Sequence, residues 1–148
     1  MRVLSLLTPD EVRSLGGLPA DAIVGGFTDG PDGEVFQANP ALPRVLQDVV
    51  RSAGPQDAAL CDAAARQGEG WVYVIDLRTP DGPQGQVQAG DIIGAFGVEH
   101  GRIDETSYEA NDAYRAFTKH GLVQLPDSLR RAFLACLASG PRPTPGRR

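Results

Sequence analysis

The side chains that could do chemistry are few and lie far apart in the sequence. Cys61 and Cys136 could each form a thiol dyad with a histidine, but no catalytic signature surrounds either cysteine. Five carboxylates could supply a general acid–base pair: Asp76, Asp91, Glu99, Asp104 and Glu105. The sequence shows no metal-ligand spacing, phosphate loop or Gly-x-Ser-x-Gly motif. It therefore predicts a non-enzymatic protein with neither a cofactor nor a metal ion.

Asp76 stands out among these carboxylates because it lies near the end of the most β-prone run, residues 70–77. Alternation along a strand places Trp71 and three more apolar side chains on one face, and Asp76 with two valines on the other. Both faces are mostly apolar, so the run predicts a central strand covered on both sides. We expect Trp71 to be a core anchor, with a partner-facing position as the alternative. Asp76 either caps the following loop or belongs to a site.

A group of aromatic and amide side chains lies further along, where Tyr108 and Tyr114 flank Asn111. Such a group on a loop can bind a peptide or a small ligand, or it can fasten the loop to a sheet. The 78–90 segment is too polar to build a core, and loops on a rigid sheet often carry recognition. We therefore predict that the chain binds another protein at this end of the sheet, through six residues: Asp76, Tyr108, Asn111, Asp112, Tyr114 and Arg115.

Local patterns predict the elements that position these residues. Thr8 and Glu11 have capping-box spacing for a helix that ends near Leu15. Hydrophobic periodicity predicts strands at 3–7, 22–28, 34–37, 70–77, 91–98 and 102–108, and helices at 41–52, 56–67 and 127–138. Residues 111–120 are expected to form a short helix or turn. The predicted fold class is α+β: an antiparallel sheet from two related strand–loop–hairpin–helix units, with helices packed on it.

The two units are predicted from short matches that recur in the same order. Residues 21–27 resemble 91–96, and residues 38–40 resemble 110–112. The alternative is that any α+β chain shows such Gly-Phe hairpins. The predicted division is a first unit at 1–54, a bridging helix at 55–70, a second unit at 71–138 and a disordered tail at 139–148. The units are expected to pack as one domain, with Phe27 and Phe96 as equivalent core residues.

Composition narrows the classes of function. The formal net charge is −5, from 19 acidic and 14 basic residues, and the sequence pI is about 4.9, which argues against a nucleic-acid binder. No apolar run reaches about 18 residues, so we expect no membrane insertion and a cytoplasmic location. Cys61 and Cys136 lie in Ala- and Leu-rich helical contexts and are expected to be buried free thiols.

The second unit also resembles a known family. An Ala-rich helix is followed by Gly-Trp-Val-Tyr-Val-Ile-Asp at 70–76, Ile-Ile-Gly-Ala-Phe at 92–96 and Glu-Ala-Asn-Asp-Ala-Tyr-Arg at 109–115. Over residues 56–138 this order resembles the type VII secretion system-associated proteins of high-GC Gram-positive bacteria, and more distantly the SseB-type accessory domains. The family pattern has proline where this chain has Asp112 and Ala116. The resemblance implies a binding or accessory protein without established catalytic residues.

Three functions follow as hypotheses. The first is a non-enzymatic cytoplasmic accessory or adaptor protein that binds a component of a type VII-like secretion system. The second is an immunity protein that neutralises a co-encoded toxin, since an acidic face can cover a basic cleft. The third is a small enzyme with a site near the 78–90 loop. A homodimer is compatible with two related units.

Overall fold

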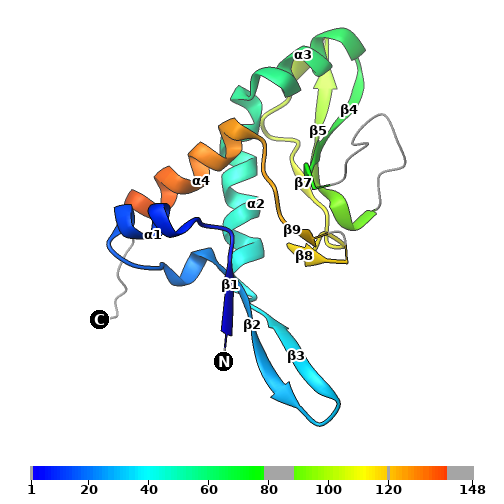
Figure 1. Ribbon diagram of the computed structural model, residues 1–148. Helices are drawn as coiled ribbons and strands as arrows, with labels where there is room; N and C mark the ends of the chain where they lie inside the picture. The colour runs from blue at the N-terminus through cyan, green and yellow to red at the C-terminus, as the bar shows by residue number, and fades with distance from the viewer. Residues whose placement is uncertain (1, 79–88, 120, 140–148) are drawn as a thin grey trace.

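A computed structural model describes residues 2–78, 89–119 and 121–139 of the protein (Figure 1). Helices pack beside antiparallel sheets, so the predicted α+β class is confirmed. The predicted 78–90 loop, apart from its ends, and the predicted tail lie outside the described residues. The division of the chain into domains stays a prediction.

The first unit holds one sheet and two helices. Strands β1 (Arg2–Ser5), β2 (Ile23–Gly30) and β3 (Gly33–Ala38) form an antiparallel sheet in the order β1-β2-β3. Helix α1 (Pro9–Leu15) begins at the predicted capping box, in which Thr8 and Glu11 each accept the other's backbone N–H. It ends at Gly16, whose φ of 80° suits a residue without a Cβ. Helix α2 (Ala41–Ala53) follows β3 directly.

The second unit repeats the sheet and adds a small hairpin. Helix α3 (Ala58–Gln67) leads into β4 (Gly70–Ile75), which pairs with β5 (Ile92–Glu99). Strand β5 also pairs with β6 (Arg102–Ile103) and β7 (Glu109–Ala110). Strands β8 (Phe117–Thr118) and β9 (Gly121–Leu122) form a separate pair before α4 (Asp127–Ser139). Residues 111–120 were predicted as a short helix or turn, and that prediction was wrong where β8 forms.

Helix α2 lies at the centre of the molecule, between α4 and the second sheet (Figure 1). Its apolar positions fall at helical spacing, and Leu42, Leu46 and Val50 are fully buried. Phe133 of α4 and Phe96 of β5, the two largest fully buried side chains, belong to the same core. This central helix therefore belongs to the core of both units. Only the face opposite these buried side chains reaches the surface.

The two units share topology and register, as predicted for residues 21–53 and 91–132. Each sheet has a register shift near the end of its first strand, beside a glycine of its second strand. The corresponding pairs are Leu4–Gly25 and Ser5–Ile23 in the first sheet, and Val74–Gly94 and Ile75–Ile92 in the second. In both units the glycine lies beneath an aromatic ring, that of Phe36 or Tyr108, where a Cβ would collide.

Asn39 and Asn111 make the same set of hydrogen bonds in the two units. Each side-chain amide donates to two carbonyls of the preceding turn and strand, each backbone N–H donates to the second strand, and each Oδ1 accepts a backbone N–H two residues on. The partners are Ala20, Ile23, Val24 and Ala41 in the first unit, and Ala89, Ile92, Ile93 and Ala113 in the second. These matched bonds support an internal repeat better than the short sequence matches did.

The phenylalanines of the two units hold equivalent positions but differ in burial. The Phe27 and Phe36 rings lie 5.1 Å apart at 54°, and the Phe96 and Tyr108 rings lie 4.8 Å apart at 48°. Phe96 is fully buried, whereas Phe27 is half-buried. The prediction of two core phenylalanines therefore holds for Phe96 alone.

Strand β4 differs from its prediction as a covered central strand. Within the described residues β4 pairs only with β5, and its outer face is open. Trp71 is 40% exposed and Tyr73 54%, whereas Val72 and Val74 point into the core. Trp71 is therefore not a core anchor. Cys61 and Cys136 are also exposed, because both lie on the outer faces of their helices, so the prediction of buried thiols was wrong.

Candidate functional site

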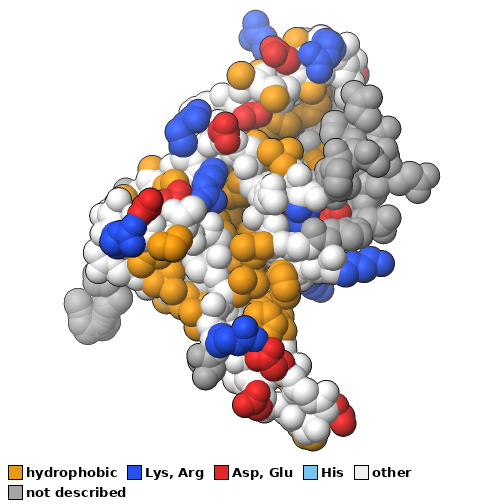
Figure 2. Space-filling view, in the orientation of Figure 1, with side chains coloured by type: hydrophobic (Ala, Val, Ile, Leu, Met, Phe, Trp, Pro, Cys, Tyr) orange, Lys and Arg blue, Asp and Glu red, His pale blue; other side chains and the backbone are white. Residues whose placement is uncertain are grey.

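A groove of about 580 Å³ runs between α2 and residues 110–117. One wall is the surface face of α2, from Leu42 to Arg51, and the other is the segment that follows β7. Phe36 and Phe117 close one end. Figure 2 shows hydrophobic side chains gathered over α2 and the base of the β2–β3 hairpin, with basic side chains around them. We call this hollow the α2 groove.

Four of the six residues predicted for partner binding line the α2 groove: Asn111, Asp112, Tyr114 and Arg115. Asp112 and Arg115 are exposed, so both can touch a partner. Asn111 has its amide engaged with the backbone, and Tyr114 is 4% exposed. The structure therefore brings the predicted group together, but assigns two of its members to holding the wall in place.

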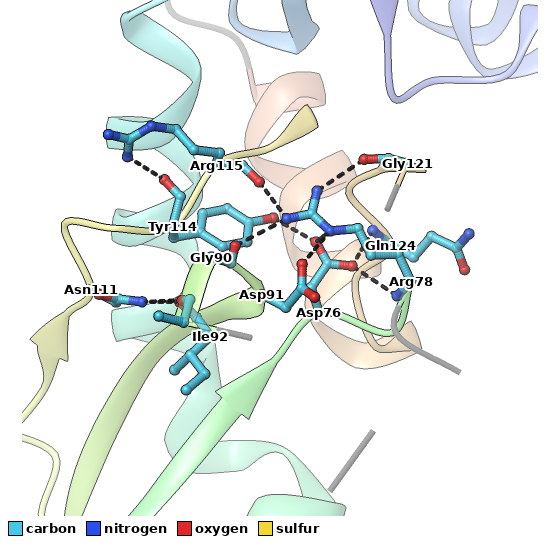
Figure 3. A network of polar contacts seen from close by, with 11 residues as sticks. Asp76, Arg78, Gly90, Asp91, Ile92, Asn111, Tyr114, Arg115, Gly121 and Gln124 are labelled. Atoms are coloured by element: carbon cyan, nitrogen blue, oxygen red, sulfur yellow. Dashed lines mark hydrogen bonds and ion pairs between the residues drawn. The ribbon is translucent and has the colours of Figure 1, made fainter. Parts of the chain in front are cut away.

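Asp76 lies outside the groove, in a buried polar network (Figure 3). Its carboxylate accepts hydrogen bonds from the Tyr114 hydroxyl at 2.7 Å, from the Gln124 backbone N–H at 2.8 Å and from the Arg78 backbone N–H at 3.0 Å. The bond from Arg78 is the loop cap expected of Asp76. Because Asp76 is 0% exposed, it cannot touch a partner directly, and the prediction that it is a contact residue was wrong.

Arg78 joins the parts of this network. Its Nε donates to Asp91 at 2.8 Å and lies 3.5 Å from Asp76. The two remaining nitrogens donate to the carbonyls of Gly90, Arg115 and Gly121. One buried guanidinium thus faces two buried carboxylates and ties the segment after β7 to the end of β4. Such pairs are costly to break, because removal of one partner leaves buried charge without compensation.

The buried environment shifts the pKa of both tyrosines. Burial raises the pKa of Tyr114 well above its usual range, and the neighbouring Asp76 carboxylate raises it further. Burial also raises the pKa of Tyr108, against the opposing charge of Arg51. Tyr108 lies beneath α2, with its hydroxyl donating to Gln47 and its ring against Phe96. It supports the α2 wall from behind and does not line the groove.

The arginines of the groove differ in whether a carboxylate neutralises their charge. Arg51 pairs with Asp48 at 2.8 Å. Arg115 donates to the backbone carbonyls of Asp112 and Tyr114, which leaves its charge unpaired by a carboxylate within the described residues. The Arg44 side chain is exposed and makes no hydrogen bond or ion pair with that part of the chain. The groove of an acidic protein therefore presents two arginines to the surface, Arg44 and Arg115, together with the exposed Asp112.

Sequence reasoning missed Arg44, Gln47 and the tie made by Arg78. Arg44 and Gln47 are polar positions on a predicted amphipathic helix, and nothing in the sequence shows which segment faces them. The sequence held one weak signal for Arg78: it directly follows a mostly apolar strand and lies two positions after Asp76, a possible ionic partner. Asp91 was named only as one half of an acid pair, and the structure pairs it with a cation instead.

Other kinds of site find no support in residues 2–78, 89–119 and 121–139. No three side chains of the types that bind metals come together there. No helix of this part of the chain has the length and hydrophobicity needed to cross a membrane. Comparisons with protein-family models, with curated proteins and with solved structures find no match.

Proposed function

We propose that this protein is a non-enzymatic accessory protein that binds a segment of another protein in the α2 groove. The groove itself carries the proposal, because it sets four of the six predicted contact residues against the exposed face of α2. A concave, mostly apolar surface with a few polar groups is the usual form of a binding site. Its walls are held by the Asn111 amide and by the buried Arg78 network, so the surface is preorganised.

The proposed partner is a cytoplasmic component of a type VII-like secretion system. The resemblance of residues 56–138 to secretion-associated proteins supports this choice. Arg44 and Arg115 add a chemical requirement, since an acidic segment would complement their charges. The groove arginines therefore favour a partner that approaches this face with its own carboxylates, although the chain as a whole has a net charge of −5.

The immunity hypothesis ranks second because of the charge in the groove. A toxin with a basic cleft would meet an acidic surface, whereas this groove presents arginines. The enzyme hypothesis ranks third, and residues 79–88, where its site was expected, lie outside the described residues. Both alternatives are outcomes of the experiment below.

The test compares two surface variants in capture from host cells. Arg44→Glu/Arg115→Glu reverses the charge of the groove, and Trp71→Ala/Tyr73→Ala removes exposed aromatic rings from β4 as the matched control. Circular dichroism first shows that both variants are folded. Captured proteins are identified, purified and titrated by calorimetry.

We expect the groove variant to weaken binding of the purified partner roughly tenfold or more, and the β4 control to bind like the wild type. Equal binding by the groove variant rules out this surface. A toxin as the titrated partner selects the immunity hypothesis, and turnover of a metabolite by the purified protein overturns the non-enzymatic proposal. Tyr108→Ala and Tyr114→Ala are unsuitable here, because both side chains support the fold.

A further inference from the structure

In the second unit the aromatic pair Phe96 and Tyr108, which matches Phe27 and Phe36 of the first unit, lies under a helix. Helix α2 crosses the inner face of the second sheet and covers Phe96 and Tyr108. Gly54, just after α2, packs so closely on the Phe96 ring that a Cβ there would approach it to 2.6 Å. Gln47, two helical turns earlier, accepts the hydrogen bond from Tyr108. A polar residue of α2 and the glycine that follows the helix thus match the two rings.

The first sheet has the same pair without a helix over it. The β2–β3 hairpin projects beyond the helices, and none of the described helices lies along it as α2 lies along β5 (Figure 1). Phe27 and Phe36 are half-buried, and the Phe117 ring of β8 packs on them at 6.1 and 5.1 Å. Phe117 is itself 36% exposed. We call these three rings the aromatic face.

The aromatic face continues into the α2 groove and has cationic neighbours. Phe36 and Phe117 belong to both, so an occupant of one can reach the other. The Arg2 guanidinium lies 5.3 Å from the centre of the Phe27 ring, and Arg2 pairs with Glu34. Arg44 and Arg115, without carboxylate partners in the described residues, lie along the groove. Exposed apolar rings rimmed by cations mark a surface for an apolar segment with negative charges.

We infer that the aromatic face binds an amphipathic α-helix of the partner protein, with an acidic flank directed at the groove arginines. This inference rests on the proposed function and names the binding element of the partner. By analogy with Gly54, the helix presents a small residue to Phe27. Because Phe36 lacks the hydroxyl that Tyr108 offers to Gln47, the residue over Phe36 is apolar. The two residues are two helical turns apart, as Gln47 and Gly54 are.

The test uses α2 itself as the template for a probe. A helix-stabilised peptide with the sequence of residues 41–56 carries Gln47→Leu, Arg44→Glu and Arg51→Glu. Fluorescence anisotropy measures its binding to the full chain. Matched peptides retain Gln47, retain both arginines, or carry Gly54→Leu. We expect each of these three peptides to bind roughly tenfold or more weakly than the probe.

Two protein variants sharpen the test. Phe117→Glu places a negative charge on the aromatic face at an exposed position, and should reduce probe binding at least tenfold. Phe36→Tyr gives the first unit the hydroxyl that Tyr108 has in the second. In this variant the peptide that retains Gln47 should bind better than the probe with Gln47→Leu, the reverse of the wild-type preference. Trp71→Ala is the control and should leave binding unchanged.

Several results would overturn the inference. The inference is wrong if no peptide binds the protein, or if the probe binds Phe117→Glu as well as it binds the wild type. It is also wrong if Phe36→Tyr still prefers the probe to the peptide that retains Gln47. A dimer in sedimentation that Phe117→Glu dissociates would show that a second copy covers the face. If the captured partner is lost from Arg44→Glu/Arg115→Glu but retained by Phe117→Glu, the proposed function stands and this inference fails. If neither variant affects capture of the partner, the proposed function and this inference both fail.

Discussion

The two units end their first strand in chemically different ways on the same backbone. In the first unit the Ser5 hydroxyl accepts the Leu7 N–H at 3.1 Å and donates to the Ala22 carbonyl at 2.8 Å. In the second unit Asp76, one position beyond the residue that matches Ser5 in register, accepts the N–H two residues on, and Asp91 holds the position that Ala22 has in the first. A neutral turn in one unit thus corresponds to a buried ionic network in the other.

The difference reflects what each unit has to hold. The second unit carries the β8–β9 hairpin between its sheet and α4, and Arg78 ties that hairpin to the strand ends. The first unit passes from β3 straight into α2 and needs no such tie. It leaves its aromatic pair half-buried instead. We therefore expect the second unit to dominate stability and the first unit to dominate recognition.

The largest expected effect is on the ionic network. Arg78→Met removes the guanidinium that lies beside the buried Asp76 carboxylate and donates to Asp91, which should cost about 3–5 kcal/mol of unfolding free energy. Ser5→Ala, which removes the neutral turn at the end of the first strand of the first unit, should cost about 1 kcal/mol. Urea denaturation at neutral pH measures both. Equal losses would show that the ionic network does not distinguish the units.

The equivalent phenylalanines give the next contrast. Phe96→Ala should cost about 3–5 kcal/mol, because a fully buried ring leaves a cavity under α2. Phe27→Ala should cost about 1 kcal/mol, since the ring is half-buried and solvent fills its place. The difference between the two denaturation midpoints is the measurement. A loss at Phe27 that matches the loss at Phe96 would mean that the first face is closed in solution.

Alkaline pH should weaken the second unit through its tyrosines. The folded-state pKa of Tyr114 and of Tyr108 is raised above the ordinary 10.0, so both stay protonated in the fold while the unfolded chain ionises. The contribution of these two tyrosines to stability should be constant below about pH 10 and then fall by up to about 1.4 kcal/mol per pH unit for each tyrosine. Tyr114→Phe should remove one such contribution. Denaturation curves at pH 8 to about 11 check this, and an unchanged slope in the variant would contradict it.

Tyr108→Phe makes the second aromatic pair resemble the first. The variant loses one hydrogen bond to Gln47 while the ring stays against Phe96, so the cost should be about 0.5–1.5 kcal/mol. The paired variant Gln47→Leu/Tyr108→Phe should recover part of that loss, because neither polar group is then left without its partner. A double-mutant cycle measures the recovery, and additive losses would show that the bond is unimportant.

The smallest effect is expected at Trp71. A core anchor, which the sequence predicted Trp71 to be, would lose about 3–5 kcal/mol on truncation to alanine. Because Trp71 is 40% exposed on an edge of the described sheet, Trp71→Ala should cost no more than about 1 kcal/mol. A large shift in the denaturation midpoint would mean that β4 is covered in solution.

Local chemistry was enough to predict most of the elements. The capping box of α1, the apolar stripe of α2 and the hairpin of the first unit appear where the patterns placed them, whereas the strand predicted at 102–108 is reduced to β6 (Arg102–Ile103). In each unit the side-chain oxygen of Asn39 or Asn111 accepts a backbone N–H only two residues on. These features depend on residues close in sequence, so composition and spacing determine them.

Tertiary structure decided which predicted features face solvent. The alternation of Trp71, Tyr73 and their neighbours predicts a strand, but burial of either face depends on elements distant in sequence, and α2 and α3 cover only one. The α2 groove needs residues 42–51 beside 110–117, and the Arg78 network needs four chain segments together. The sequence by itself determined the elements and their order, because those follow from local backbone and side-chain preferences. Only the tertiary structure determined the groove, the open aromatic face and the buried ions, because each depends on which surfaces the folded chain brings into contact.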